Sequence, residues 1–219
     1  MIEALTDVTE KKRRAVVGES PTVLSEIYQE DVNISVWERK QSPELQKAIS
    51  DFLRLNPAFE KSITVSAEEV RAELQKVTDG TAPDILIDSI AELVDMFCFL
   101  FELKRAGVRL ATLDRAMCPR FHVDRVPSRL VTTYKGIATQ WLLNKDVDRS
   151  KLGQGSNGLP DEESGLLSSN RSINQLRCGD VALLKGESWY NNENMGLVHR
   201  SPPVPDGECR LLLTVDFSD

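Results

Sequence analysis

The chain has 219 residues and a formal net charge of −7, from 34 acidic and 27 basic side chains. Apolar residues make up 41% and charged residues 28%, which excludes an intrinsically disordered chain and allows a sizeable core. The acidic balance argues against a nucleic-acid partner, because such proteins need basic side chains to neutralise phosphates.

Residues 1–106 are predicted to form a mainly helical region, although the first 40 show no clear pattern. Ser42 precedes a proline, a pair typical of a helix N-cap and the first helical position. Ser66 and Glu69 have the spacing of a capping box, in which each side chain binds the other residue's backbone amide. We therefore expect helices to begin near both serines.

A long helix is predicted at residues 85–101, where apolar residues recur at spacings of one, three and four. Gly107, shortly after two basic residues, predicts where this helix ends. The stretch also carries Asp88, Glu92 and Asp95, whose charges are costly in lipid. We interpret it as a buried helix of a protein without a membrane partner.

The four cysteines also bear on the compartment. They form no CxxC pair, and their spacing predicts no disulfide framework. Reduced thiols are typical of the cytoplasm, so we expect a cytoplasmic location.

Residues 107–219 are predicted to be rich in β-strands. β-branched and aromatic residues concentrate in four segments, 121–134, 138–143, 181–184 and 210–217. Residues 144–176 are instead rich in Asn, Asp, Ser and Gly, which predicts a long polar connection of the kind that often forms a lid. We therefore expect an α+β protein in which the helices pack against a β-sandwich or small barrel.

The sequence contains only two histidines, His122 and His199. Residues two apart on a strand point to the same side, so His122 and Asp124 are expected to project together. Two imidazoles and one carboxylate form the ligand set of non-haem Fe(II) oxygenases, which leaves coordination positions open. His199 follows Asp124 by 75 residues, a spacing that lets a jelly roll bring a late strand beside an early one. These three residues are therefore predicted to bind a divalent metal.

Other interpretations of these residues stay open. His122 and Asp124 can simply hydrogen-bond to each other. Cys118 has the strand parity of His122, and as a fourth ligand it would favour Zn²⁺ over Fe²⁺ in a closed, non-catalytic site. Cys118 can equally be an inert thiol.

Four segments carry a family signature: Cys118–Asp124, Arg129–Gly136, Gly179–Glu187 and Gly196–Pro203. They resemble a bacterial family catalogued as domain of unknown function 1826, and the resemblance covers most of the chain. The genes of this family often lie near those of zinc-responsive metallochaperones, so the resemblance implies a link to metal homeostasis.

The ligand pattern is similar, more loosely, to that of the double-stranded β-helix superfamily, which includes Fe(II)/2-oxoglutarate oxygenases. This likeness implies a helical N-terminal half, residues 1–106, packed on an antiparallel double-stranded β-helix (jelly roll, cupin-like), residues 107–219. The two parts are expected to form one compact unit.

The same likeness implies roles for residues around the metal. In 2-oxoglutarate oxygenases a basic residue early in the last strand pairs with the far carboxylate of the co-substrate, and Arg210 has this position. Arg129 and Tyr134 are the other residues predicted to contact the co-substrate. The predicted substrate pocket is walled by Arg120, which is also a fallback carboxylate clamp, and by Trp141 and Trp189.

Three functions are compatible with the sequence. The first is an Fe(II)/2-oxoglutarate oxygenase that acts on a small molecule or a protein. The second is a non-catalytic zinc-binding protein linked to metal homeostasis. The third is a cupin-like module that binds a small molecule without a metal. The sequence identifies neither the substrate nor the oligomeric state.

Overall fold

The computed structural model describes residues 13–169 and 172–218. The helices are α1 (Pro43–Leu55), α2 (Val70–Val77) and α3 (Asp84–Phe101), and the 3-10 helices are η1 (Pro21–Tyr28), η2 (Asn144–Asp146), η3 (Arg149–Lys151) and η4 (Gly153–Ser156). The strands are β1 (Arg14–Gly18), β2 (Val32–Trp37), β3 (Glu60–Val65), β4 (Ala106–Leu113), β5 (Ser128–Lys135), β6 (Gln140–Leu142), β7 (Ile173–Gln175), β8 (Val181–Lys185), β9 (Val198–Arg200) and β10 (Arg210–Phe217).

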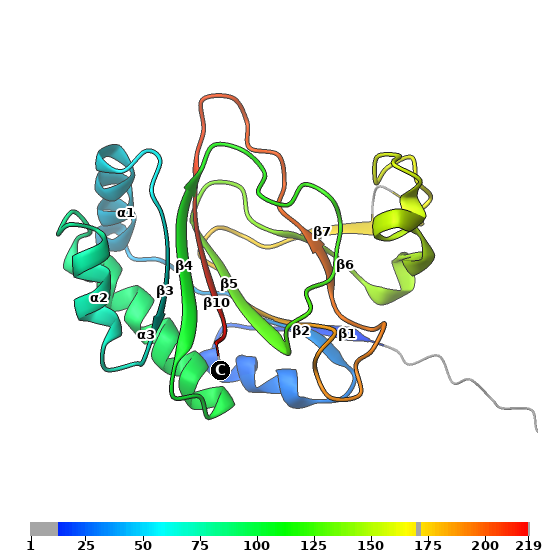
Figure 1. Ribbon diagram of the computed structural model, residues 1–219, viewed down its shortest axis with the longest axis horizontal. Helices are drawn as coiled ribbons and strands as arrows, with labels where there is room; N and C mark the ends of the chain where they lie inside the picture. The colour runs from blue at the N-terminus through cyan, green and yellow to red at the C-terminus, as the bar shows by residue number, and fades with distance from the viewer. Residues whose placement is uncertain (1–12, 170–171, 219) are drawn as a thin grey trace, which may run out of the picture.

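The strands form two sheets (Figure 1). The large sheet has seven strands in the order β1-β2-β8-β5-β10-β4-β3, and the small sheet has three in the order β7-β6-β9. Neighbouring strands are antiparallel except for the parallel pair β1 and β2. The molecule is therefore a mixed α/β protein with mainly antiparallel sheets.

The helix starts follow the local sequence. The Ser42 side chain accepts a hydrogen bond from the Leu45 amide, and Ser66 and Glu69 bind each other's amides at 3.3 and 3.4 Å, so both predicted caps are confirmed. The end predicted for the long helix is wrong. Helix α3 stops at Glu102, which has a φ of 54°, whereas Gly107 already belongs to β4.

The N-terminal region is less helical than the sequence suggests. It contributes strands β1, β2 and β3 to the large sheet beside the three α-helices. The large sheet thus combines strands from both sides of residue 106. No helix in the described ranges is long and apolar enough to span a bilayer.

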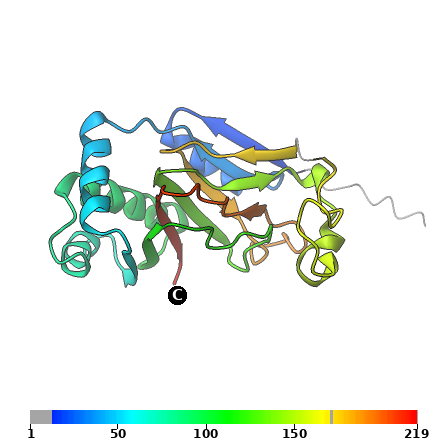
Figure 2. The same ribbon diagram turned by 90° about the horizontal axis from the view of Figure 1, so that it is seen from above.

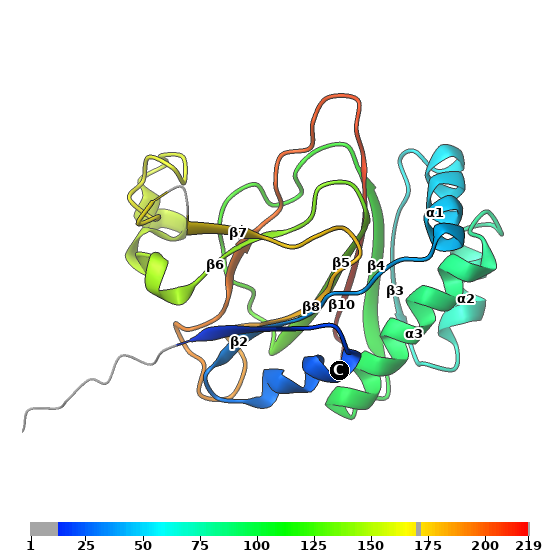
Figure 3. The same ribbon diagram turned by 180° about the vertical axis from the view of Figure 1, so that it is seen from behind.

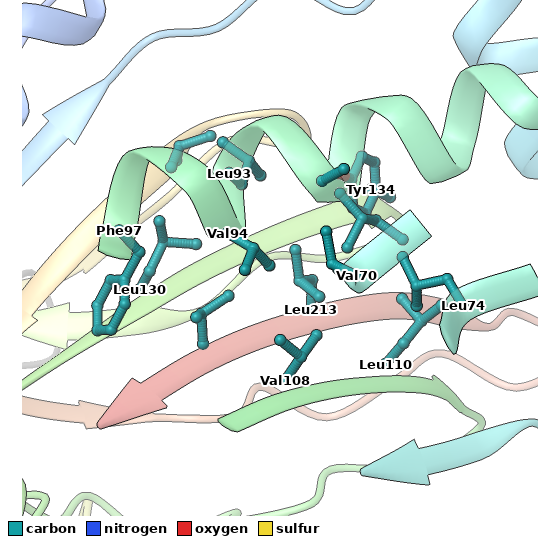
Figure 4. Packing of buried hydrophobic residues seen from close by; sticks show 14 of the residues in the cluster. Val70, Leu74, Leu93, Val94, Phe97, Val108, Leu110, Leu130, Tyr134 and Leu213 are labelled. Carbon is teal, nitrogen blue, oxygen red and sulfur yellow. The ribbon is translucent and has the colours of Figure 1, made fainter. Parts of the chain in front are cut away.

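The large sheet has helices on one side and the small sheet on the other (Figures 2 and 3). It separates two apolar cores. Helices α1–α3 and η1 cover one face, where Phe97 of α3 packs near Leu130 and Leu213 (Figure 4). The small sheet covers the other face, where Trp141 packs in a second cluster with Val131 and Leu212. Alternate residues of β5 and β10 therefore enter different cores.

Residues 144–169 form a folded unit, here called the cap, at the end of the molecule away from the helices (Figure 1). It contains η2–η4, and Leu166 is buried in a third apolar cluster with Phe121, Leu142 and Val198. The sequence predicted a long polar connection over 144–176. The apolar residues spaced through this stretch pack into that shared cluster, and residues 170–171 lie outside the described ranges.

Candidate metal centre

Backbone pairing brings the two histidines together. His199 lies in β9, and the amide and carbonyl of His122 bond to the carbonyl and amide of His199 at 3.0 and 2.9 Å. This bridge is isolated, so His122 and Asp124 lie on an extended segment rather than on the continuous strand that the sequence predicted. The imidazole centroids lie 4.6 Å apart, on the side that faces the large sheet.

Asp124 completes the cluster. Its carboxylate oxygens lie 3.3 Å from Nε2 of His199 and 3.7 Å from Nε2 of His122. One ligand atom from each of the three residues lies within 4.8 Å of the others. The structure thus brings together the three side chains that the sequence singled out. Cys118, although exposed beside them, is outside this group.

The other ring nitrogens fix the orientation of both imidazoles. Nδ1 of His122 lies 2.9 Å from the Arg120 carbonyl, and Nδ1 of His199 lies 3.1 Å from the Leu197 carbonyl. Carbonyl oxygens only accept, so each neutral ring carries its proton on Nδ1 and turns the Nε2 lone pair toward Asp124. Burial and the neighbouring imidazole lower the pKa of His122, which favours this neutral form.

A divalent cation fits this donor set. In the neutral tautomers two nitrogen lone pairs and a carboxylate face one another with no proton between them, an arrangement that a cation stabilises. Burial alone would raise the pKa of Asp124, but the imidazole of His199 and the guanidinium of Arg129 outweigh it and hold that pKa at about 2. The carboxylate is therefore ionised, as a metal ligand must be.

Arg129 lies behind the carboxylate. It donates from Nη1 to Asp124 at 2.8 Å, and from Nε and Nη2 to Asp216 at 2.7 and 3.1 Å. These three bonds orient the guanidinium toward the two carboxylates, and Arg129 also lines the cavity of the two histidines. Its contact with a co-substrate stays a prediction. Asp216, which the sequence reasoning missed, neutralises Arg129 and holds it against Asp124.

Arg210 is a cation of a different kind. The residue has 0% exposure, and it donates to the hydroxyls of Ser201 and Thr133, while its Nε is buried without a partner. Within the described residues it forms no ion pair with a carboxylate. Burial lowers its pKa to about 10. Arg210 lines the same cavity as His122 and His199, a space of about 50 Å³.

The cavity wall follows the alternation of β10. Arg210, Leu212 and Thr214 line the cavity, and Asp216 continues the same side of the strand. The residues between them are apolar and face the helices, as Leu213 does. A period of two read from Arg210 to Phe217 would have identified Thr214 and Asp216 as residues on the side of the metal centre.

Tyr134, predicted to contact the co-substrate, and Trp189, predicted to wall the substrate pocket, lie away from the cavity of the two histidines. Tyr134 is buried on the helix-facing side of β5, where its hydroxyl bonds to Ser89 of α3 at 2.9 Å. Trp189 packs against Tyr28 and Phe101, also away from the cavity. The structure does not bring these two side chains to the histidines, because the pattern of aromatic residues does not reveal which face each side chain takes.

The other two pocket residues are neighbours of the centre but do not line its cavity. Trp141 pairs with His199 in register and packs in the core between the sheets. Arg120 turns outward to the cap and donates to Asp161 at 3.0 Å. Their place in the wall of a substrate pocket stays a prediction.

Comparison with known proteins places the chain among related folds. The family model described as protein of unknown function (DUF1826) matches residues 18–216. No curated protein matches the sequence. Among solved structures, the rice dioxygenase for auxin oxidation is similar with a TM-score of 0.51 and 9% identity, covering 94% of this chain and 82% of that one. Dioxygenase for auxin oxidation 1 from Arabidopsis thaliana, in a binary complex with 2-oxoglutarate, has a TM-score of 0.51 and 8% identity over 93% and 91%. At these identities the likeness establishes a shared fold only.

Proposed function

The chain belongs to the DUF1826 family, and we propose that it is a mononuclear non-haem Fe(II)/2-oxoglutarate oxygenase. The observation that carries this proposal is one cavity lined both by the two histidines of the triad and by a buried arginine without an acidic partner. A metal and a dicarboxylate would satisfy both features at once. The similar fold of a dioxygenase that binds 2-oxoglutarate supports the same assignment.

Each residue of the centre has a distinct role in this proposal. His122, Asp124 and His199 hold the metal, and their Nδ1 contacts and Arg129 keep them oriented. Bound Fe²⁺ would supply the chemistry of oxygen activation, with 2-oxoglutarate as co-substrate, for the oxidation of a substrate. Arg210 binds the distal carboxylate, for which its planar fork and unpaired Nε are suited.

The cavity beside the histidines is too small to hold a co-substrate without a movement of its wall. About 50 Å³ holds one or two water molecules, far less than the roughly 300–1,000 Å³ of typical ligand pockets. A neighbouring polar cleft of about 300 Å³ shares Met117, Arg129 and Thr214 with it. Arg129 is held by two carboxylates, whereas the thioether of Met117 is flexible. We therefore propose that Met117 moves aside to join the two spaces, and that the substrate occupies the outer cleft.

The proposal extends to the fold. The two facing sheets and the likeness to dioxygenase structures support a double-stranded β-helix, with the helices packed on its large sheet. The large sheet draws strands from both halves of the chain, so we propose a single structural unit rather than two domains.

The direct experiment measures succinate. Purified protein with Fe²⁺, ascorbate and 2-oxoglutarate is expected to form succinate even without its substrate, and His199→Ala is expected to abolish it. Ser89→Ala, on the opposite side of the large sheet, is the matched control and is expected to keep the wild-type rate. Tight Zn²⁺ binding with no succinate above the His199→Ala background would contradict the proposal and indicate a non-catalytic metal-binding protein.

A further inference from the structure

Asp161 of the cap is a buried carboxylate outside the metal centre. It is 4% exposed and accepts three hydrogen bonds. The Phe121 amide donates at 2.8 Å, Arg120 Nε at 3.0 Å and Arg200 Nη1 at 3.3 Å. These three donors come from the two segments that carry the histidines, so one side chain ties the cap to both.

The contacts continue to the imidazoles. Arg120, which Asp161 holds by its side chain, supplies the carbonyl that binds Nδ1 of His122. Phe121 directly precedes His122, and Arg200 directly follows His199. The Arg200 guanidinium also lies 4.3 Å from the centroid of the Phe121 ring, so the two segments contact each other under the cap.

Side chains alternate along the two histidine segments, so the cap lies on the side opposite to the imidazoles. Phe121 and Val198 are buried in the apolar cluster of the cap, whereas His122 and His199, one residue further along, face the large sheet. The cap therefore packs against the back of both ligand segments. Asp161 adds charged and directional bonds to both of them.

We propose that Asp161 is a positioning residue for the metal centre: it fixes the distance and orientation between the two histidine segments so that both imidazoles meet one metal ion. This inference rests on the proposed metal site. It assigns the cap a function in metal binding, through a residue that the ligand pattern does not reveal.

Glu162 provides a matched control. It also binds Arg200, at 2.8 Å, and it is the next residue in the chain. The bonds of Arg120 Nε and the Phe121 amide go to Asp161 instead, and the charge of Arg120 acts on Glu162 without a hydrogen bond among the described residues. Glu162→Gln and Asp161→Asn both remove one negative charge beside Arg200. Only Asp161→Asn weakens the link between the two histidine segments.

The experiment titrates metal-free protein with Co²⁺ and measures heat and the visible absorption of the bound ion. Partners beyond the ligands typically change metal affinity 10–100-fold, so Asp161→Asn is expected to weaken Co²⁺ binding by about 10-fold and to alter the Co²⁺ spectrum. Glu162→Gln is expected to retain the wild-type affinity and spectrum. Nitrogen-15 NMR of the metal-free protein is expected to show a changed environment for His122 Nδ1 in Asp161→Asn alone.

The outcomes separate this inference from the proposed function. If the wild-type chain binds no Co²⁺, the metal site itself is wrong and the inference falls with it. If the wild type binds Co²⁺ and both variants match it in affinity and spectrum, Asp161 is not a positioning residue, while the oxygenase proposal stands.

A second variant covers the case in which Asp161→Asn does not fold. Arg120→Gln removes one of the three bonds to Asp161, the one from the residue whose carbonyl binds Nδ1 of His122. The Arg120 side chain is 46% exposed and therefore tolerant of substitution. It is expected to weaken Co²⁺ binding and to change the His122 signal while it leaves His199 unchanged. Wild-type Co²⁺ affinity in Arg120→Gln would overturn the inference.

Discussion

The two faces of strands β5 and β10 differ in what they bury. Toward the helices, Leu130, Tyr134 and Leu213 enter a continuous apolar core in which the Tyr134 hydroxyl is satisfied by Ser89. Toward the small sheet, the same strands present polar and charged groups, including Arg129, Thr133, Arg210, Thr214 and Asp216. One face provides stability and the other presents the chemistry, although their residues alternate along the same backbone.

This difference teaches that folding and function are separable within single strands. The helix-facing residues are apolar and closely packed, so their truncation leaves cavities. The opposite face retains a buried guanidinium with an unpaired Nε, which a sequence selected for stability alone would not keep. Substitutions on the two faces should therefore change different measured quantities.

The largest change in the free energy of unfolding is expected for a substitution on the helix-facing side. Phe97 of α3 is 1% exposed and packs edge-on against Phe101 and Phe217. Phe97→Ala is expected to lower the free energy of unfolding by about 3–5 kcal/mol, because it removes buried apolar area and leaves a cavity. Urea unfolding measures this loss, and Co²⁺ titration below the unfolding transition is expected to give the wild-type affinity. A matching loss of Co²⁺ affinity would show that the two faces are coupled.

A smaller change, in the pH dependence of stability, is expected from Lys185, whose side chain is buried among the helix-facing residues. It is 1% exposed, donates to the Gln29 carbonyl at 2.8 Å and lies 4.9 Å from the Trp189 ring centroid. Burial and the nearby charge of Arg13 lower its pKa from 10.5 to about 8, so the folded chain releases this proton before the unfolded chain does. Between pH 8 and 10.5 the unfolded state binds more protons, and stability therefore rises with pH.

The unfolding free energy is expected to rise by about 1–3 kcal/mol over this pH range. Urea unfolding at several pH values from 7.5 to 10.5 checks it, with Lys185→Met as the reference that cancels other titrating groups. The difference in unfolding free energy between wild type and Lys185→Met is expected to shift in favour of wild type as pH increases. A difference that stays constant would show that Lys185 keeps its ordinary pKa.

Local signals explain which parts of the molecule the sequence predicts. The caps at Ser42 and Ser66 depend on residues within one turn, and the scarcity of histidine marks His122 and His199 as candidates wherever the strands run. Strands β1 and β3 were missed because they are short strands that pair at the two edges of the large sheet. Strand β2 lies inside the sheet, and its alternating Val32, Ile34 and Val36 are a strand signal that the prediction overlooked. Trp189 has no strand pattern around it, so nothing in the sequence showed its direction.

The alternation of side chains along a strand would have separated two residues that were predicted to act together. Arg129 and Tyr134 were both predicted to contact the co-substrate, but they are five residues apart on β5 and therefore face opposite sides. Asp216 illustrates the converse case. It shares the parity of Arg210, and its pairing with Arg129 depends on β5 and β10 being neighbours, which only the sheet order reveals.

The smallest change in stability is expected at Arg210, where its sign is informative. A charged side chain at 0% exposure without a carboxylate destabilises the fold, and its apolar replacement is often neutral or stabilising. Arg210→Met is therefore expected to leave the unfolding free energy unchanged or to raise it by about 1 kcal/mol, since loss of the bonds to Ser201 and Thr133 offsets part of the gain.

Arg210→Met is expected to weaken the binding of 2-oxoglutarate, although it does not lower stability. Arg210→Met should retain Co²⁺ affinity, because Arg210 is not a ligand, yet lose the spectral change that 2-oxoglutarate produces in the Co²⁺ protein. Urea unfolding and visible absorption on the same samples measure both effects. A loss of stability above about 2 kcal/mol, with the 2-oxoglutarate response intact, would make Arg210 a structural residue, because removing a partner from a buried polar network has that cost. The contrast between the two faces would then fail at the residue on which the co-substrate assignment depends.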